Sequence, residues 1–188
     1  MLGLWLRPGA NARGKYLREK KIFGLIGNNV RYQPRTIPLY PELIKLHNNI
    51  MVAAGVRFIT HDASNTILRK LGMGRFPEHV GCIEVMDNVF IGYNVTILPD
   101  VRIGENVIIG ASSTVTKDLE PNGVYAGSTA KKIKAFDEFA RNHAELPEGG
   151  FSYPYVEHNQ RISESEIQLA WESFYCERKS VTTNNSLQ

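Results

Sequence analysis

The stretch from Val85 to Glu120 reads VMDNVF IGYNVT ILPDVR IGENVI IGASST VTKDLE and repeats every six residues. Each repeat begins with a β-branched aliphatic residue, and these first positions are Val85, Ile91, Ile97, Ile103, Ile109 and Val115. A period of six does not match the 3.6-residue period of an amphipathic helix, but it is a multiple of the two-residue period of a strand. The fourth positions hold residue types that tolerate tight turns, namely Asn88, Asn94, Asp100, Asn106 and Ser112. The pattern therefore predicts short strands joined by corners and stacked as a parallel β-helix, a mainly β fold.

Weaker copies of the same pattern precede this stretch, at residues 26–31, 46–51 and 52–57. The frame slips between them near Pro34, Pro38 and Pro41, which predicts an irregular coil there. We therefore expect the β-helix to span residues 25–130. Residues 59–82 break the period and contain His61 and His79. A loop of this length inside a repeat array is typically functional.

The flanks predict helices. Residues 1–24 form a short helical lead, in which the basic stretch 10–21 is expected to pack on the first coil. Residues 131–179 are expected to form a helical extension, with one helix over residues 133–144 and a second that starts at a capping box from Ser163 to Glu166. Residues 180–188 are expected to be a flexible tail.

The composition narrows the function classes. The chain has 188 residues, 43% of them hydrophobic, and a net charge of +3. These values fit one globular domain with an appendage and give no support to nucleic-acid binding. No apolar run approaches the ~20 residues that a membrane-spanning helix needs, so we expect a cytoplasmic protein. Cys82 and Cys176 have neither metal-ligand spacing nor a disulfide framework.

The run from IGYNVT to AKKIK resembles the hexapeptide-repeat acyltransferases, a family of left-handed parallel β-helices. Within that superfamily the chain is most similar to the sugar and polysaccharide O-acetyltransferases, and VRFITHDASN resembles the catalytic loop of the polysaccharide group. The resemblance implies a homotrimer in which acetyl-CoA, the co-substrate, lies in the groove between two prisms. It also implies a left-handed crossover, which is the rare hand for parallel strands.

His61 is the candidate general base. A sugar hydroxyl is a poor nucleophile until its proton is removed, and histidine is the side chain whose ordinary pKa suits that task near neutral pH. His61 also matches the catalytic histidine of the family loop. Asp62 follows it directly and is a candidate to orient the imidazole ring and to stabilise its protonated form.

The resemblance assigns the acetyl-CoA site residue by residue. The N–H of Tyr93 is expected near the acetyl group and the backbone of Ala111 near the pantetheine arm. Thr116 and Lys117 are expected near the adenosine end. Lys131 and Lys134 match basic positions near the phosphates, and Lys132 is a further candidate there. Lysines at one rim would attract the negative charges of coenzyme A.

The sequence departs from its relatives at three places and leaves alternatives open. Phe90 stands where many relatives have Trp, Ser128-Thr129 replaces an Asn-Pro pair, and the acceptor-binding residues of the galactoside enzymes have no clear match. The prediction is therefore an acetyl-CoA-dependent O-acetyltransferase that acts on a sugar of unidentified structure. Two alternatives stay open: an enzyme that N-acetylates an amino sugar, and a non-catalytic β-helix scaffold. A zinc enzyme on the same fold is disfavoured because the five histidines lack short spacings, so no metal is expected.

Overall fold

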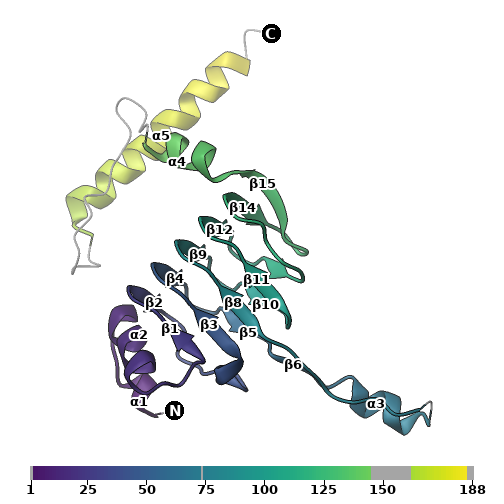
Figure 1. The fold of residues 1–188 in the computed structure, drawn as a ribbon. Helices are drawn as coiled ribbons and strands as arrows, with labels where there is room; N and C mark the ends of the chain where they lie inside the picture. The colour runs from purple at the N-terminus through teal and green to yellow at the C-terminus, as the bar shows by residue number, and fades with distance from the viewer. Residues whose placement is uncertain (1, 73, 145–161, 186–188) are drawn as a thin grey trace. The chain divides into compact units, whose positions relative to one another are not determined.

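The computed structural model describes residues 2–72, 74–144 and 162–185, in two compact units that divide after Phe139. The first unit contains the repeat, and Figure 1 shows its strands stacked coil upon coil. The second unit is helical. Each is described by itself.

Three sheets form the walls of the repeat, and the chain visits them in turn. Sheet A contains β1 (Leu25–Ile26), β3 (Ile44–Leu46), β8 (Ile83–Val85) and β11 (Val101–Ile103). Sheet B contains β2 (Val30–Tyr32), β4 (Ile50–Val52), β9 (Val89–Ile91), β12 (Val107–Ile109), β14 (Gly123–Ala126) and β15 (Lys131–Ala135). Sheet C contains β5 (Arg57–Phe58), β10 (Thr96–Ile97) and β13 (Thr114–Val115). Except for β15, neighbouring strands in these sheets are parallel.

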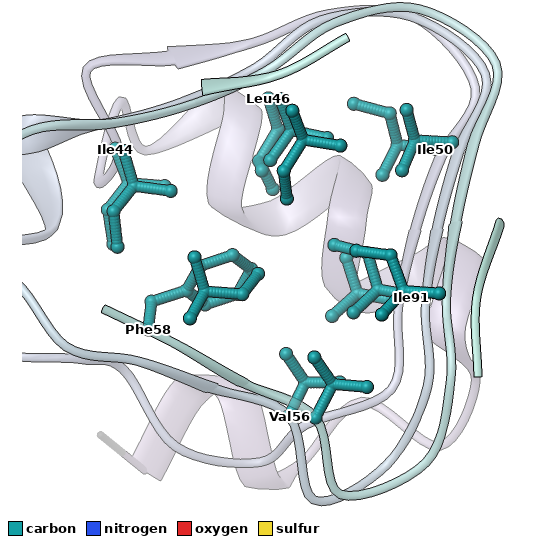
Figure 2. Packing of buried hydrophobic residues seen from close by; sticks show 14 of the residues in the cluster. Ile44, Leu46, Ile50, Val56, Phe58 and Ile91 are labelled. Carbon is teal, nitrogen blue, oxygen red and sulfur yellow. The ribbon is translucent and has the colours of Figure 1, made fainter. Parts of the chain in front are cut away.

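The register confirms the six-residue reading. Thr96 pairs with Thr114 and Val89 with Val107, so in this part of the chain the partners lie three repeats apart, and one coil is three hexapeptides. All six first-position residues are fully buried, and the fifth positions, from Val89 to Leu119, are at most 4% exposed. Figure 2 shows side chains from the three walls meeting in one interior, among them Ile44, Phe58 and Ile91. The predicted aliphatic column is confirmed.

The corners confirm the turn prediction. The five fourth-position residues adopt the left-handed conformation, with φ between 54° at Asn106 and 62° at Asn94. Asparagine tolerates this region because its short polar side chain can bond locally. Along the corner between sheets A and B the side chains also bond from coil to coil, Asn49 to Asn88 at 3.1 Å and Asn88 to Asn106 at 3.0 Å. The corner residues thus set both the turn and the contact between coils.

The row of bonded asparagines at this corner predicts an unusual order of stabilities for two variants of Asn88. Asn88→Ala and Asn88→Gly both remove the side-chain bonds, but only alanine is strained at φ 59°. We expect the alanine variant to be less stable than the glycine variant by about 1 kcal/mol. Urea unfolding of the two variants measures the difference, and equal stability would show that the backbone conformation is not the cause.

Two helices close the first coil. They are α1 (Leu2–Trp5) and α2 (Ala10–Glu19), and Figure 1 shows α2 beside β2. Leu17 is fully buried, and the Arg13 guanidinium is buried with its Nε donating to the carbonyl of Tyr32 at 3.0 Å. Gly14 lies directly against the carbonyl of Val30, where a Cβ would not fit. The predicted packing of this basic helix on the first coil is confirmed.

The other end of the coil differs from the expectation. The helix predicted over residues 133–144 starts only at Phe136, as α4 (Phe136–Ala144), because Lys131–Ala135 forms β15 antiparallel to β14. A strand here pairs the last parallel strand of sheet B, whose backbone groups would otherwise remain an open edge. The sequence of this segment carries no six-residue repeat, which concealed the pairing.

In the second unit, α5 (Glu164–Asn185) begins as predicted. The Ser163 backbone N–H donates to the Glu166 carboxylate at 2.7 Å, and the Glu166 N–H donates to the Ser163 hydroxyl, which completes the capping box. The helix continues to Asn185, into the segment predicted as a flexible tail, and no glycine or proline interrupts it; residues 186–188 lie outside the described part. The apolar side chains of α5 that the structure describes are largely exposed, at 53% for Trp171, which stacks on Tyr175. None of the described helices could span a membrane.

Candidate functional site

The long loop leaves the coil at the corner between sheets C and A. It consists of β6 (His61–Asp62), α3 (Asn65–Lys70) and β7 (His79–Val80), and β6 pairs antiparallel with β7. Figure 1 shows α3 at the far end of this excursion. Two contacts hold its base to the next coil: His79 Nε2 lies 2.8 Å from the Asp100 carboxylate, and the Cys82 N–H donates to that carboxylate at 3.2 Å. The loop therefore starts and ends at fixed points.

His61 lies at the base of this loop. Its side chain is half-buried and makes an edge-to-face contact with the Tyr40 ring, with 5.9 Å between the ring centroids. Its Nδ1 atom is buried and has no hydrogen-bond partner among the described residues. The ring is therefore held by packing rather than by a hydrogen bond at Nδ1.

The Asp62 carboxylate bonds to Ser64. It accepts the Ser64 N–H at 2.8 Å and the Ser64 hydroxyl at 3.1 Å. These bonds, with smaller contributions from the two nearby histidines, lower the pKa of the Asp62 carboxyl below its usual value. Adjacent residues in a strand point to opposite faces, so the bonds to Ser64 shape the loop, and the role of Asp62 toward the imidazole stays a prediction.

Three of the residues assigned to coenzyme A line one pocket. Thr116, Lys117 and Lys131 surround a space of about 890 Å³ together with Lys132. The pocket also lies at the corner between sheets C and A, and Asp100, which anchors the loop, forms part of its wall. Its volume is within the ~300–1,000 Å³ typical of small-molecule and cofactor sites.

Some charged side chains of this pocket have partners within the chain and others do not. Asp100 pairs with His79, and the Asp118 carboxylate accepts the N–H of Arg102 at 2.7 Å. Lys117 and Lys131 have no ion pair within the described part of the chain. Among the described residues, Lys117 and Lys131 are therefore unpaired cations in a lining that also contains the carboxylates of Asp100, Asp118 and Glu120.

Lys134 lies apart from these lysines. It does not line the pocket, and its amine lies 3.7 Å from the Glu138 carboxylate. The expected helix is replaced by a strand, in which a register irregularity separates Lys132, opposite Tyr125, from Lys134, opposite Val124. Lys132 thus takes the place at the pocket that the sequence assigned to Lys134.

Tyr93 and Ala111 lie at a different corner, between sheets B and C, on successive coils. The Tyr93 carbonyl accepts the N–H of Ser112 at 2.8 Å. The N–H groups of Tyr93 and Ala111 donate no hydrogen bond within the described residues, and both residues are exposed. Their neighbour Gly92 has no room for a Cβ, which would lie 2.6 Å from the carbonyl oxygen of Ile109. Two backbone donors without a partner among the described residues therefore lie along one edge of the prism.

The structure thus assembles the predicted residues in two groups. His61, Thr116 and Lys117 follow the corner between sheets C and A, and Lys131, on β15 of sheet B, lines the same pocket as Thr116 and Lys117. Tyr93 and Ala111 follow the corner between sheets B and C. The strands of sheet C separate the two corners, so one chain does not bring the groups face to face.

Some residues of the site could not be found from the sequence. The ion pair of His79 with Asp100 and the contact of Tyr40 with His61 join segments about twenty residues apart that share no motif. Within the described residues no three histidine, cysteine, aspartate or glutamate side chains gather as metal ligands would. Cys82 is a free, exposed thiol, and the side chain of Cys176 lies outside the described part.

Comparison with known proteins gives the family. The model of the bacterial transferase hexapeptide (six repeats) matches residues 83–117. Protein CapG of Staphylococcus aureus is 40% identical over 131 residues, which is 65% of this chain and 74% of that protein. Galactoside O-acetyltransferase of Escherichia coli is 38% identical over 97 residues, 50% of this chain but only 45% of that enzyme.

A solved structure shares the fold. A hexapeptide-repeat-containing acetyltransferase from Vibrio cholerae matches with a TM-score of 0.54 and 19% identity, over 72% of this chain and 85% of that one. The buried six-residue column, the family match and the long alignment to CapG agree. The chain belongs to the family of bacterial hexapeptide-repeat transferases.

Proposed function

We propose that this protein transfers an acetyl group from acetyl-CoA to a sugar hydroxyl in polysaccharide or glycoconjugate biosynthesis. The observation that carries the proposal is that His61 and the lysine-rimmed pocket lie along the same corner of the prism. The activity named for the galactoside relative supports it. Residues 25–130 then form the acyltransferase domain, with residues 59–82 as its catalytic loop. A cytoplasmic location would give it access to acetyl-CoA.

Coenzyme A fits the large pocket by charge and size. Its phosphates are negative, and Lys117, Lys131 and Lys132 stand at a rim where the nearby aspartates are already engaged. The pocket at about 890 Å³ is large enough for one end of the molecule. Long-range attraction to such a rim also raises the rate of encounter.

His61 supplies the proton acceptor. The imidazole removes the proton from the acceptor hydroxyl as its oxygen attacks the thioester carbonyl, so a carbon–oxygen bond forms. When the carbon–sulfur bond breaks, the same proton passes to the leaving sulfur. A positioned base contributes about 10²- to 10⁴-fold. The edge contact with Tyr40 keeps the ring in place for this transfer.

The N–H of Tyr93 stabilises the negative charge that develops on the carbonyl oxygen, and the N–H of Ala111 binds the pantetheine arm. Neither donor has a partner among the described residues, and both residues are exposed. A well-placed backbone donor of this kind is worth roughly 10²- to 10³-fold. Because these donors and His61 lie at different corners, the complete site needs a second chain.

That second chain belongs to a homotrimer of left-handed prisms. The outward-facing residues of sheet B include Met51, Phe90 and Ile108, which pair side by side across β4, β9 and β12. Phe90 is 42% exposed. The outward positions of sheet A are instead charged, at Lys45, Glu84 and Arg102. The outward row of sheet B is therefore apolar except for Arg31 beside Met51, and an apolar surface of this kind is typical of one that a sister chain covers.

The direct test is acetyl-CoA consumption, read by thiol release, against a panel of sugars and amino sugars, with the products identified by mass spectrometry. An O-acetyl ester on a sugar supports the proposal. An N-acetyl product would replace it with amino-sugar acetylation. Thiol release with none of the acceptors, together with no binding of coenzyme A, would leave a non-catalytic scaffold.

The pocket makes its own prediction. Lys117→Glu and Lys131→Glu should each raise the KM for acetyl-CoA about tenfold with little change in kcat, because the reversed charge repels the phosphates. The effect should shrink as salt is added. Lys45→Glu changes the same charge on sheet A and serves as the control. An unchanged KM in both pocket variants would place coenzyme A elsewhere.

A further inference from the structure

A second, smaller pocket adjoins His61. Its volume is about 210 Å³, and Thr36, Leu39, Arg57, Phe58 and His61 contribute to its lining. This is below the ~300 Å³ at which small-molecule sites usually begin, so it suits a single ring or one group of a longer molecule. A residue that lines this pocket together with His61 is therefore in a position to select the acceptor on which His61 acts.

The wall of this pocket is fixed before anything binds. The buried Tyr32 hydroxyl donates to the carbonyl of Thr36 at 3.0 Å, and the Thr60 hydroxyl donates to the carbonyl of Leu39. Phe58 is 4% exposed and belongs to the core column. These contacts hold the proline-containing segment 34–41 against the coil from which His61 emerges, so the pocket is largely pre-formed.

Arg57 gives the pocket its charge. It lies on β5, four residues before His61, and its side chain is exposed. It has no ion pair within the described part of the chain, although Arg102 on sheet A pairs with Glu84 at 2.9 Å. No aspartate or glutamate lines the pocket. Arg57 and His61 therefore line one small space with no carboxylate among its lining residues.

We propose that this pocket binds an acidic group on the acceptor, a carboxylate or a phosphate carried by a sugar, and that Arg57 recognises it. The inference rests on the proposed function and adds to it the class of acceptor. A guanidinium presents a planar pair of donors that matches a carboxylate or a phosphate, which a lysine does not reproduce. Holding the acidic group at Arg57 places a hydroxyl of the same sugar ring at His61.

The test compares matched acceptors in wild type, Arg57→Gln and Arg57→Lys. The acceptors are methyl glucoside, methyl glucuronide, in which a carboxylate replaces the C6 hydroxymethyl group, and glucose 1-phosphate, in which a phosphate replaces the methyl group on O1. Wild type should use one of the two acidic sugars with a kcat/KM at least about tenfold above methyl glucoside, and which one it prefers identifies the acidic group. Arg57→Gln should lose this preference and retain its rate on methyl glucoside, and Arg57→Lys should recover it only in part. Lys45→Gln, which removes the same charge from sheet A, should keep the preference.

The outcomes separate this inference from the proposed function. Equal transfer to all three sugars, or a preference that survives in Arg57→Gln, overturns the inference and leaves acetyl transfer standing. Transfer to none of them counts against the proposed function; binding of methyl glucuronide and glucose 1-phosphate, measured by calorimetry without acetyl-CoA, then decides the inference. Binding to wild type that Arg57→Gln weakens about tenfold or more supports it, and binding of neither sugar overturns it.

Discussion

His61→Ala should lower kcat at least about a hundredfold while leaving the fold and the KM for acetyl-CoA nearly unchanged. The loss follows from removal of the only proton acceptor that the proposal places at the acceptor hydroxyl. Stability should be retained because the imidazole is half-buried and its buried Nδ1 has no partner that the substitution would leave unsatisfied. Steady-state kinetics and thermal unfolding of the same preparation measure both.

Two variants serve as controls. His61→Asn keeps a polar side chain but cannot accept the proton, so it should be as inactive as the alanine variant. His47→Gln alters another half-buried histidine, which pairs with Glu84 on sheet A at 3.1 Å, and should remain active. A near-wild-type rate in His61→Ala would remove His61 from the mechanism.

The largest expected effect on stability is in the aliphatic column. Ile97→Ala should cost about 2–5 kcal/mol, because Ile97 is fully buried between Phe58 and Val115 of the adjoining coils and its loss leaves a cavity. Thermal unfolding at one protein concentration should show a clear drop in midpoint, since assembly makes the midpoint depend on concentration.

Thr96→Ala is the matched control, because Thr96 is the preceding residue of β10 and points to the outside of the prism. It should change the free energy of unfolding by no more than about 1 kcal/mol. Similar losses in the two variants would mean that the inward and outward positions of the repeat had been confused.

The coil was the most predictable part of the fold because one physical pattern recurs in every repeat. A buried branched residue such as Ile91 and a left-handed corner residue such as Asn94 recur in every repeat. A misread residue in one repeat therefore does not change the predicted fold. The segment Lys131–Ala135 had no such repetition, and its pairing with β14 could not be seen from its own residues.

The site was predictable only in its separate pieces. His61, Lys117 and Lys131 could be named from motif positions. How they lie relative to one another depends on the number of coils between them, which the motifs do not give. The orientation of Asp62 depended on Ser64, a local competitor for its carboxylate. The pocket formed by Arg57 and the segment 34–41 arises from a contact across the first coils, for which the sequence has no signature.

A crystal structure with bound coenzyme A would test the central claim most directly. The account predicts phosphates against Lys117 and Lys131, and a thiol beside the Tyr93 N–H of one chain and within reach of His61 from its neighbour, directly or through one water. Coenzyme A bound away from the lysine rim, or a thiol far from every His61 in the assembly, would contradict it.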